Sequence, residues 1–158
     1  MFALLFLLVL DSKAENSTFN VCESGWLEST HVGMGCLQFN NISKMSWLEA
    51  VTHCQDKDAN LVEVFDDYQL DFLRTQLDML DDHESAKKTW WTGGNDIGHE
   101  GDWMWIGSFE SVGDFLWYSS QPNGGTSQNC IYLSPNYYYL AGDGSCTSTL
   151  NPICQKFL

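Results

Sequence analysis

The sequence contains few basic residues. It has 7 Lys and Arg against 21 Asp and Glu among 158 residues, a formal net charge of -14. Nucleic acids and anionic membrane surfaces are bound through clustered Lys and Arg, and the only basic pair here is Lys87-Lys88. The composition therefore argues against a nucleic-acid partner and against a charged membrane surface. We interpret the acidity as a source of solubility.

Long hydrophobic runs are also scarce. The apolar run Phe2–Leu10 spans nine residues, fewer than the roughly 20 that cross a bilayer as a helix, so no membrane insertion is predicted. Small residues follow at Ser12 and Ala14, a pattern typical of a secretory signal peptide over residues 1–14. Residues 15–21 would then form a short leader, and the mature protein would be secreted and extracellular.

The motifs of several enzyme classes are missing too. The sequence has no Cys-x-x-Cys, no His-Glu-x-x-His and no Gly-x-Ser-x-Gly, which mark zinc or redox centres, zinc proteases and nucleophile turns. No motif pairs two carboxylates for glycosidase chemistry. We interpret the four scattered histidines as surface residues and predict a protein without enzymatic activity. The histidines are His31, His53, His83 and His99.

Six cysteines indicate an oxidising, extracellular compartment. An even number in a small exported chain predicts three disulfides, and the sequence alone leaves fifteen pairings open. Two glycosylation sequons, at Asn16 and Asn41, are usable only in a secretory pathway and predict a glycoprotein. The cysteines are Cys22, Cys36, Cys54, Cys130, Cys146 and Cys154.

Two helices are predicted in a chain that has no repeat, low-complexity segment or linker. In the first, within residues 46–55, Ser46 and Glu49 form a capping box ahead of an apolar stripe. The second opens at Asp66, with Gln69 at its third position, and continues as a leucine stripe. The stripes are Trp47, Ala50, Val51 and Cys54, then Leu70, Leu73, Leu77 and Leu80.

The sequence pattern changes after the second helix. The acidic residues that close the second helix are interpreted as solvated; they are Asp78, Asp81, Asp82 and Glu84. After residue 88, short aromatic segments alternate and are separated by Gly and Asp, which is typical of strands. The segments are TWWTGG, DWMWIG, DFLWYSS, CIYLS and PICQKF. With an N-terminal strand, this predicts an α+β fold of two helices, small antiparallel sheets and one long irregular loop.

These features together resemble the C-type lectin-like family, over about residues 22–156. The resemblance rests on Cys22 and Cys36 around an N-terminal hairpin, on WTGGND followed by EGDWMW, and on the order of the last three cysteines. It implies one domain over residues 22–158, of the secreted, single-domain type found in invertebrates. It also implies the pairs Cys22–Cys36, Cys54–Cys154 and Cys130–Cys146, and a ligand-binding role for the long loop.

The resemblance further implies a sugar site built on calcium. Calcium takes six to eight oxygen ligands, so two adjacent sugar hydroxyls can join its shell. The family's ligands come from a triplet around a cis proline, here Gln121-Pro122-Asn123, from an acid before a cysteine, here Gln128, and from an Asn-Asp pair, here Gly142-Asp143. The implied carbohydrate-binding residues are Gln121, Asn123, Gln128, Asn129 and Asp143, and all of these except Asn129 are implied calcium ligands.

The implied calcium site is short of charge. Only Asp143 keeps a carboxylate, and fewer charged ligands mean weaker binding, so we expect a calcium affinity on the order of millimolar. The triplet mixes the Glu-Pro-Asn of mannose-type sites with the Gln-Pro-Asp of galactose-type sites, which leaves the sugar open. Asp96 and Glu100 match two acids of the family's auxiliary calcium position. The alternative, which we favour, is that these two residues only shape a turn.

Exposed aromatic residues offer a second clue. Strand alternation would turn at least one of Tyr137–Tyr139 outward, where it could pack against a sugar ring; the alternative is that all three belong to the core. Trp91 and Tyr118 remain undecided between the two roles. We assign Trp47, Trp103 and Trp105 to the core.

Two functional hypotheses follow. The first is a lectin that binds glycans or glycoproteins on cell or microbial surfaces in innate immunity, with self-association to raise the avidity of weak single sites. The second is a calcium-independent C-type-lectin-like domain that binds protein or another non-glycan ligand. The retained Asp143 supports the first, and the missing acid at Gln128 supports the second.

Overall fold

The computed structural model describes residues 22–82 and 86–157. The predicted signal peptide (1–14), the leader (15–21) with the Asn16 sequon, and His83 and Glu84 lie outside these ranges. Within the two ranges, no helix combines the length and the apolar character needed to cross a membrane.

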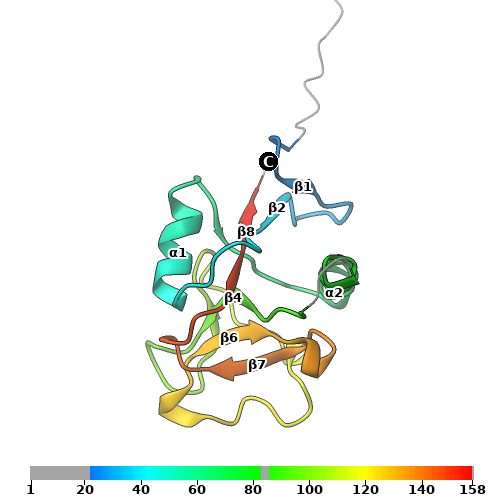
Figure 1. Ribbon diagram of the computed structural model, residues 1–158. Helices are drawn as coiled ribbons and strands as arrows, with labels where there is room; N and C mark the ends of the chain where they lie inside the picture. Colours follow the sequence, from blue (N-terminus) through cyan, green and yellow to red (C-terminus); the bar gives the residue numbers. More distant parts are fainter. Residues whose placement is uncertain (1–21, 83–85, 158) are drawn as a thin grey trace, which may run out of the picture.

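Eight short strands form a mixed sheet in the order β1-β2-β8-β4-β6-β7, with β3 paired to β8 and β5 to β4. The predicted antiparallel pairing holds except between β4 and β8, which run parallel and join the two halves of the sheet. Figure 1 shows β6 and β7 at the end of the molecule away from β1 and β2. The strands span Leu27–Glu28 (β1), Cys36–Phe39 (β2), Asn60–Leu61 (β3), Trp90–Asn95 (β4), Met104–Trp105 (β5), Cys130–Leu133 (β6), Ala141–Gly144 (β7) and Asn151–Lys156 (β8).

Helix α1 spans Trp47–Gln55 and begins as predicted. Glu49 Oε2 accepts both the backbone N–H and the hydroxyl of Ser46, at 2.8 and 2.7 Å. The whole predicted apolar stripe is buried. The stripe therefore fixes the rotation of α1 against the sheet.

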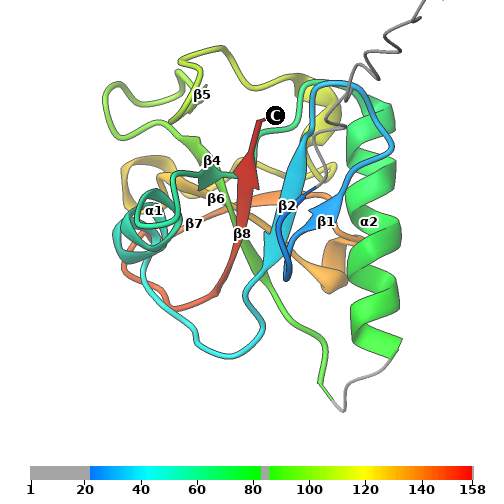
Figure 2. The same ribbon diagram turned by 90° about the horizontal axis from the view of Figure 1, so that it is seen from above.

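Helix α2 spans Asp67–Asp82 and is capped by Asp66, whose Oδ1 accepts the Gln69 N–H at 2.8 Å. The Gln69 side chain in turn accepts the Phe65 N–H. Leu70, Leu73 and Leu77 are buried in the larger core cluster, and Leu80 packs partly buried against it. The two helices lie on opposite sides of the central strands β8 and β4 (Figures 1 and 2).

The prediction that the acidic end of α2 is solvated is wrong for Asp81. Asp81 is only 6% exposed. Its Oδ2 accepts a hydrogen bond from the buried hydroxyl of Tyr139, and its Oδ1 accepts the Lys88 N–H. The carboxylate can be buried because both oxygens have donors.

The three disulfides pair as the family resemblance implies: Cys22–Cys36, Cys54–Cys154 and Cys130–Cys146. The second joins α1 to β8 across a sequence separation of 100 residues. A crosslink over such a loop stabilises the fold by roughly 4–5 kcal/mol in the chain-entropy model. The third closes 16 residues that contain β7 and the turn before it.

One segment predicted as a strand forms a turn, and a second turn precedes Tyr138 and Tyr139, for which strand alternation was expected. Asp114–Leu116 forms the 3₁₀ turn η1, because its apolar residues and Trp117 all pack against one core cluster, whereas a strand would send alternate side chains to opposite faces. Pro135–Tyr137 forms the 3₁₀ turn η3, capped by Ser134. Tyr138 and Tyr139 follow with positive φ, which exposes Tyr138 and buries Tyr139.

Candidate functional site

The loop that carries the predicted triplet is held against the sheet by one carboxylate. Gln121 and Pro122 are joined by a cis peptide bond. Asp143, on β7, accepts the N–H of Asn123 at 2.9 Å on one oxygen and the N–H of Gly124 at 2.7 Å on the other. Asp143 is 2% exposed. Its charge therefore fixes the backbone of the loop through two charge-assisted hydrogen bonds.

Only one of the two polar atoms in the Gln121 side chain has a hydrogen-bond partner. Its Nε2 donates to the Tyr137 hydroxyl at 3.3 Å, and its Oε1 is buried without a hydrogen-bond partner. The exposed side chain of Asn123 donates to the Ser120 carbonyl. A buried acceptor without a donor is destabilising, so a cation or a hydroxyl group at Gln121 Oε1 would remove that cost.

Tyrosine rings fill the space beside Gln121. Tyr118 stacks on Tyr137 with ring centroids 4.5 Å apart and 12° between the planes, and Tyr132 lies 6.3 Å from Tyr137. Burial, followed by the hydrogen bond to Tyr137, raises the pKa of Tyr132 to about 12. Sequence reasoning did not assign Tyr132 to the site, because Tyr132 and Tyr137 come from β6 and η3 and no local pattern brings their rings together.

Gly142 lies beneath these rings. A Cβ at position 142 would lie 2.8 Å from the Tyr132 hydroxyl oxygen and 2.9 Å from Cε2 of Tyr137. Both distances are shorter than real Cβ contacts, so a larger residue does not fit unless the rings move. The position that the resemblance gives to an Asn ligand is therefore occupied by aromatic rings.

Gln128 is brought to the same loop. Its side chain lies against the backbone of Gly124, where an added Cβ would be 2.1 Å from Gln128 Oε1. Gly124, which precedes the 3₁₀ turn η2 at Gly125–Ser127, therefore makes room for the side chain of Gln128. A glutamate of equal size would fit the same space.

The predicted auxiliary residues form a second cluster. Asp96 is 2% exposed; its N–H donates to the Asn129 carbonyl at 3.2 Å, and its Oδ2 accepts the Gly101 N–H at 2.9 Å. Asp96 thus shapes the turn before Trp103. Its Oδ1 and the Asn129 Oδ1 are nevertheless both buried without a partner. Glu100 Oε1 lies 4.0 Å from the position of a Cβ on Gly125, so it faces the same loop.

Comparison with known proteins identifies this arrangement. Residues 43–156 match the family model of the lectin C-type domain. The chain belongs to the C-type lectin family. Members of this family are binding proteins, and this C-type lectin domain is not an enzyme.

The relatives of this C-type lectin domain differ in length. The C-type mannose receptor 2 of Homo sapiens is 28% identical over 138 residues, which are 87% of this chain and 9% of the receptor. The perlucin-like protein of Mytilus galloprovincialis is 27% identical over 134 residues, 84% of this chain and 81% of that protein. The carbohydrate-recognition domain of the mouse scavenger receptor C-type lectin shares the fold, with a TM-score of 0.72 at 23% identity over 87% of this chain and 98% of that one.

The two positions that the resemblance assigns to calcium differ in how well their residues fit the metal. Among residues 22–82 and 86–157, no three or more His, Cys, Asp or Glu side chains are grouped to hold a metal ion. At the sugar position, both oxygens of Asp143, its single carboxylate, already accept N–H groups. The auxiliary position fits better, because Asp96 and Asn129 each offer an unpaired buried oxygen and calcium prefers oxygen ligands.

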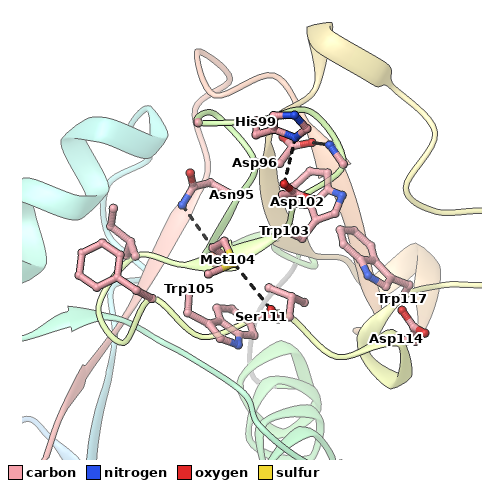
Figure 3. Close-up of a pocket in the computed structure, with 15 residues that line it drawn as sticks. Asn95, Asp96, His99, Asp102, Trp103, Met104, Trp105, Ser111, Asp114 and Trp117 are labelled. Carbon is pink, nitrogen blue, oxygen red and sulfur yellow. Dashed lines mark hydrogen bonds and ion pairs between the residues drawn. The ribbon is translucent and has the colours of Figure 1, made fainter.

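A hollow lies along β5 and η1 (Figure 3). Its volume is about 700 Å³, and Trp103 and Trp117 meet in its wall with centroids 4.9 Å apart and 69° between the planes. The prediction that Trp103 is a core residue holds in part: it packs partly buried against the larger core cluster and also lines the hollow. Trp47, Trp91 and Trp105 are buried.

Proposed function

We propose that this C-type lectin domain is a secreted lectin that binds glycans through the 121–129 loop and Asp143, with weakly bound calcium. The observation that carries the proposal is the unpaired, buried Oε1 of Gln121 in a loop that Asp143 already holds in place. A preformed loop avoids the entropy cost of ordering on binding. Asn123, Gln128 and Asn129 would supply further amide groups to sugar hydroxyls.

Calcium would bind at two positions with unequal affinity. Asp96, Asn129 and Glu100 would hold an ion that ties η2 to the turn before Trp103, and Gln121 with Asp143 would hold one only weakly. The bound metal would supply a Lewis-acidic contact for sugar hydroxyls. The unpaired oxygens of Asp96 and Asn129 support the first position, although we favoured the turn-shaping role of Asp96 and Glu100 on sequence alone.

The compartment and partners belong to the same proposal. All six cysteines are paired, which suits an oxidising, extracellular environment. Asn41 is exposed and would carry a glycan there. Recognition of microbial or host surface glycans in innate immunity would need several domains together, since single sites of this kind are weak and gain avidity by multivalency.

The direct test is binding of the disulfide-intact protein to a glycan panel, in calcium and in chelator. Gln121→Ala should abolish the calcium-dependent part, whereas Gln55→Ala, at the exposed end of α1, should not. Glycan binding that Gln121→Ala leaves unchanged would place the site elsewhere. An absence of glycan binding under both conditions would end the proposal.

A second candidate function is supported by Gly142. Tyr132 and Tyr137 cover the position where a calcium ligand would stand, which favours a binding surface that works without metal. The same glycan panel separates the two candidates, since this one predicts no glycan binding either in calcium or in chelator.

A further inference from the structure

We propose that the hollow at Trp103 and Trp117 is an extended subsite for an uncharged oligosaccharide, whose terminal sugar occupies the Gln121 loop. The inference rests on the proposed lectin function and adds to it the ligand's size and charge.

The hollow is continuous with the predicted sugar site. A second hollow of about 490 Å³ is lined by Gln121 and Pro122 and also by Trp103 and Trp117. It shares both tryptophans with the 700 Å³ hollow, together with Gly101 and Asp114. Each volume lies within the roughly 300–1,000 Å³ of small-molecule sites. A glycan that starts at Gln121 therefore has a path along the indole pair.

Aromatic surface lines this path. Trp103 and Trp117 are half-buried, so part of each indole faces the hollow. Phe109 also lines it, with 73% of its surface exposed and with φ at 60°. A bulky residue rarely takes this left-handed conformation, and here it leaves a ring in solvent. Sugar rings present apolar C–H faces that pack on such rings.

The charges at the hollow select against acidic ligands. Asp102 and Asp114 line it and are exposed, and Figure 3 shows Asp114 beside the indole of Trp117. His99 lies beside one of these carboxylates, with its Nδ1 3.0 Å from Asp102 Oδ2. Carboxylates accept hydrogen bonds from sugar hydroxyls, and like charges are repelled. The subsite therefore fits neutral sugars and disfavours sialylated or sulfated ones.

The test compares ligands of increasing length. Titration calorimetry would measure the affinity for mannose, mannobiose and mannotetraose and for the matching galactose series. The expected result is tighter binding of the tetrasaccharide than of the monosaccharide in one series. Phe109→Asn should weaken the tetrasaccharide about three- to tenfold and leave the monosaccharide unchanged. Asparagine accepts the left-handed backbone, so the variant should fold; Tyr68→Asn, an equally exposed aromatic on α2, is the matched control.

A second pair of variants tests the charge. Asp102→Asn with Asp114→Asn should raise the affinity for a sialylated tetrasaccharide relative to the neutral one, and Asp78→Asn with Asp82→Asn on α2 should not. Equal affinities along both length series, or an equal loss of mono- and tetrasaccharide in Phe109→Asn, would overturn the subsite while the lectin function stands. No binding of any sugar by the wild-type protein would overturn both.

Discussion

Asp143 holds the N–H of Asn123, twenty residues earlier in the chain, at 2.9 Å, and uses its second oxygen for Gly124. The sole carboxylate that the family resemblance assigns to the sugar site therefore has a structural role before any ligand binds. It links β7 to the loop, and the stability of the loop depends on it.

The Asp143→Asn variant tests this link. An amide nitrogen would replace one acceptor and face a backbone N–H, so we expect a loss of about 1.5–3 kcal/mol in the free energy of unfolding, measured by urea denaturation. Asp82→Asn, which alters an exposed carboxylate on α2, should stay within about 0.5 kcal/mol. Equal effects in the two variants would show that the loop needs no such anchor.

The contact between α2 and the residues that follow η3 gives a second prediction. Tyr139→Phe removes the hydroxyl donor of Asp81 and leaves a buried carboxylate with only the Lys88 N–H. The free energy of unfolding, measured by urea denaturation, should fall by about 1–3 kcal/mol. The neighbouring Tyr138 is 72% exposed, so Tyr138→Phe should be nearly neutral. A neutral Tyr139→Phe would mean that water satisfies Asp81.

Calcium affinity should respond to charge at positions where a carboxylate fits. Gln128→Glu with Asn129→Asp changes no side-chain size and adds two ligand charges, so calorimetry should show affinity for calcium about tenfold higher or more. Gln55→Glu with Asn136→Asp adds the same charge at exposed positions and should have little effect. If both double variants bind calcium alike, the oxygens near Asp96 do not form a metal site.

Alkaline pH should destabilise the tyrosine cluster. An unfolded tyrosine ionises near pH 10, whereas burial raises the pKa of Tyr132 to about 12 in the folded protein. Its contribution is thus fully present below about pH 10 and is lost as the pH rises to about 12, because the unfolded state releases the proton first. Tyr132→Phe should reduce the slope of unfolding free energy against pH in this window. Tyr68→Phe, on the exposed face of α2, should keep the wild-type slope.

Local signals in the sequence predicted much of the fold. The capping box at Ser46 and Glu49 and the apolar stripe of α1 depend on neighbours within a few residues, and both are confirmed. The disulfide pairs required the family resemblance, because spacing leaves fifteen choices. The strand predicted at residues 114–120 was wrong because apolar composition does not separate a strand from a 3₁₀ turn that packs on one face.

The candidate site was predictable only in part. The triplet that starts at Gln121, together with Gln128 and Asp143, could be placed by resemblance. In the structure Gln128 lies in the same loop as the triplet, and Asp143, on β7, accepts hydrogen bonds from that loop. The sequence could not show that aromatic rings cover Gly142, since Tyr132 and Tyr137 come from different elements. The sequence places Trp103 against the core, which it does contact, but gives no sign that it also lines a hollow with Trp117.

The long loop also shields the end of the sheet. β7 is the last strand in the order, yet its outer edge is covered at its first residue: Trp117 bridges to Ala141, and the Tyr118 N–H donates to the Ala141 carbonyl at 3.0 Å. An open edge would be a template for strand addition between molecules. Changes near Trp117 thus risk aggregation, whereas residues 119–129 can vary for ligand choice without uncovering that edge.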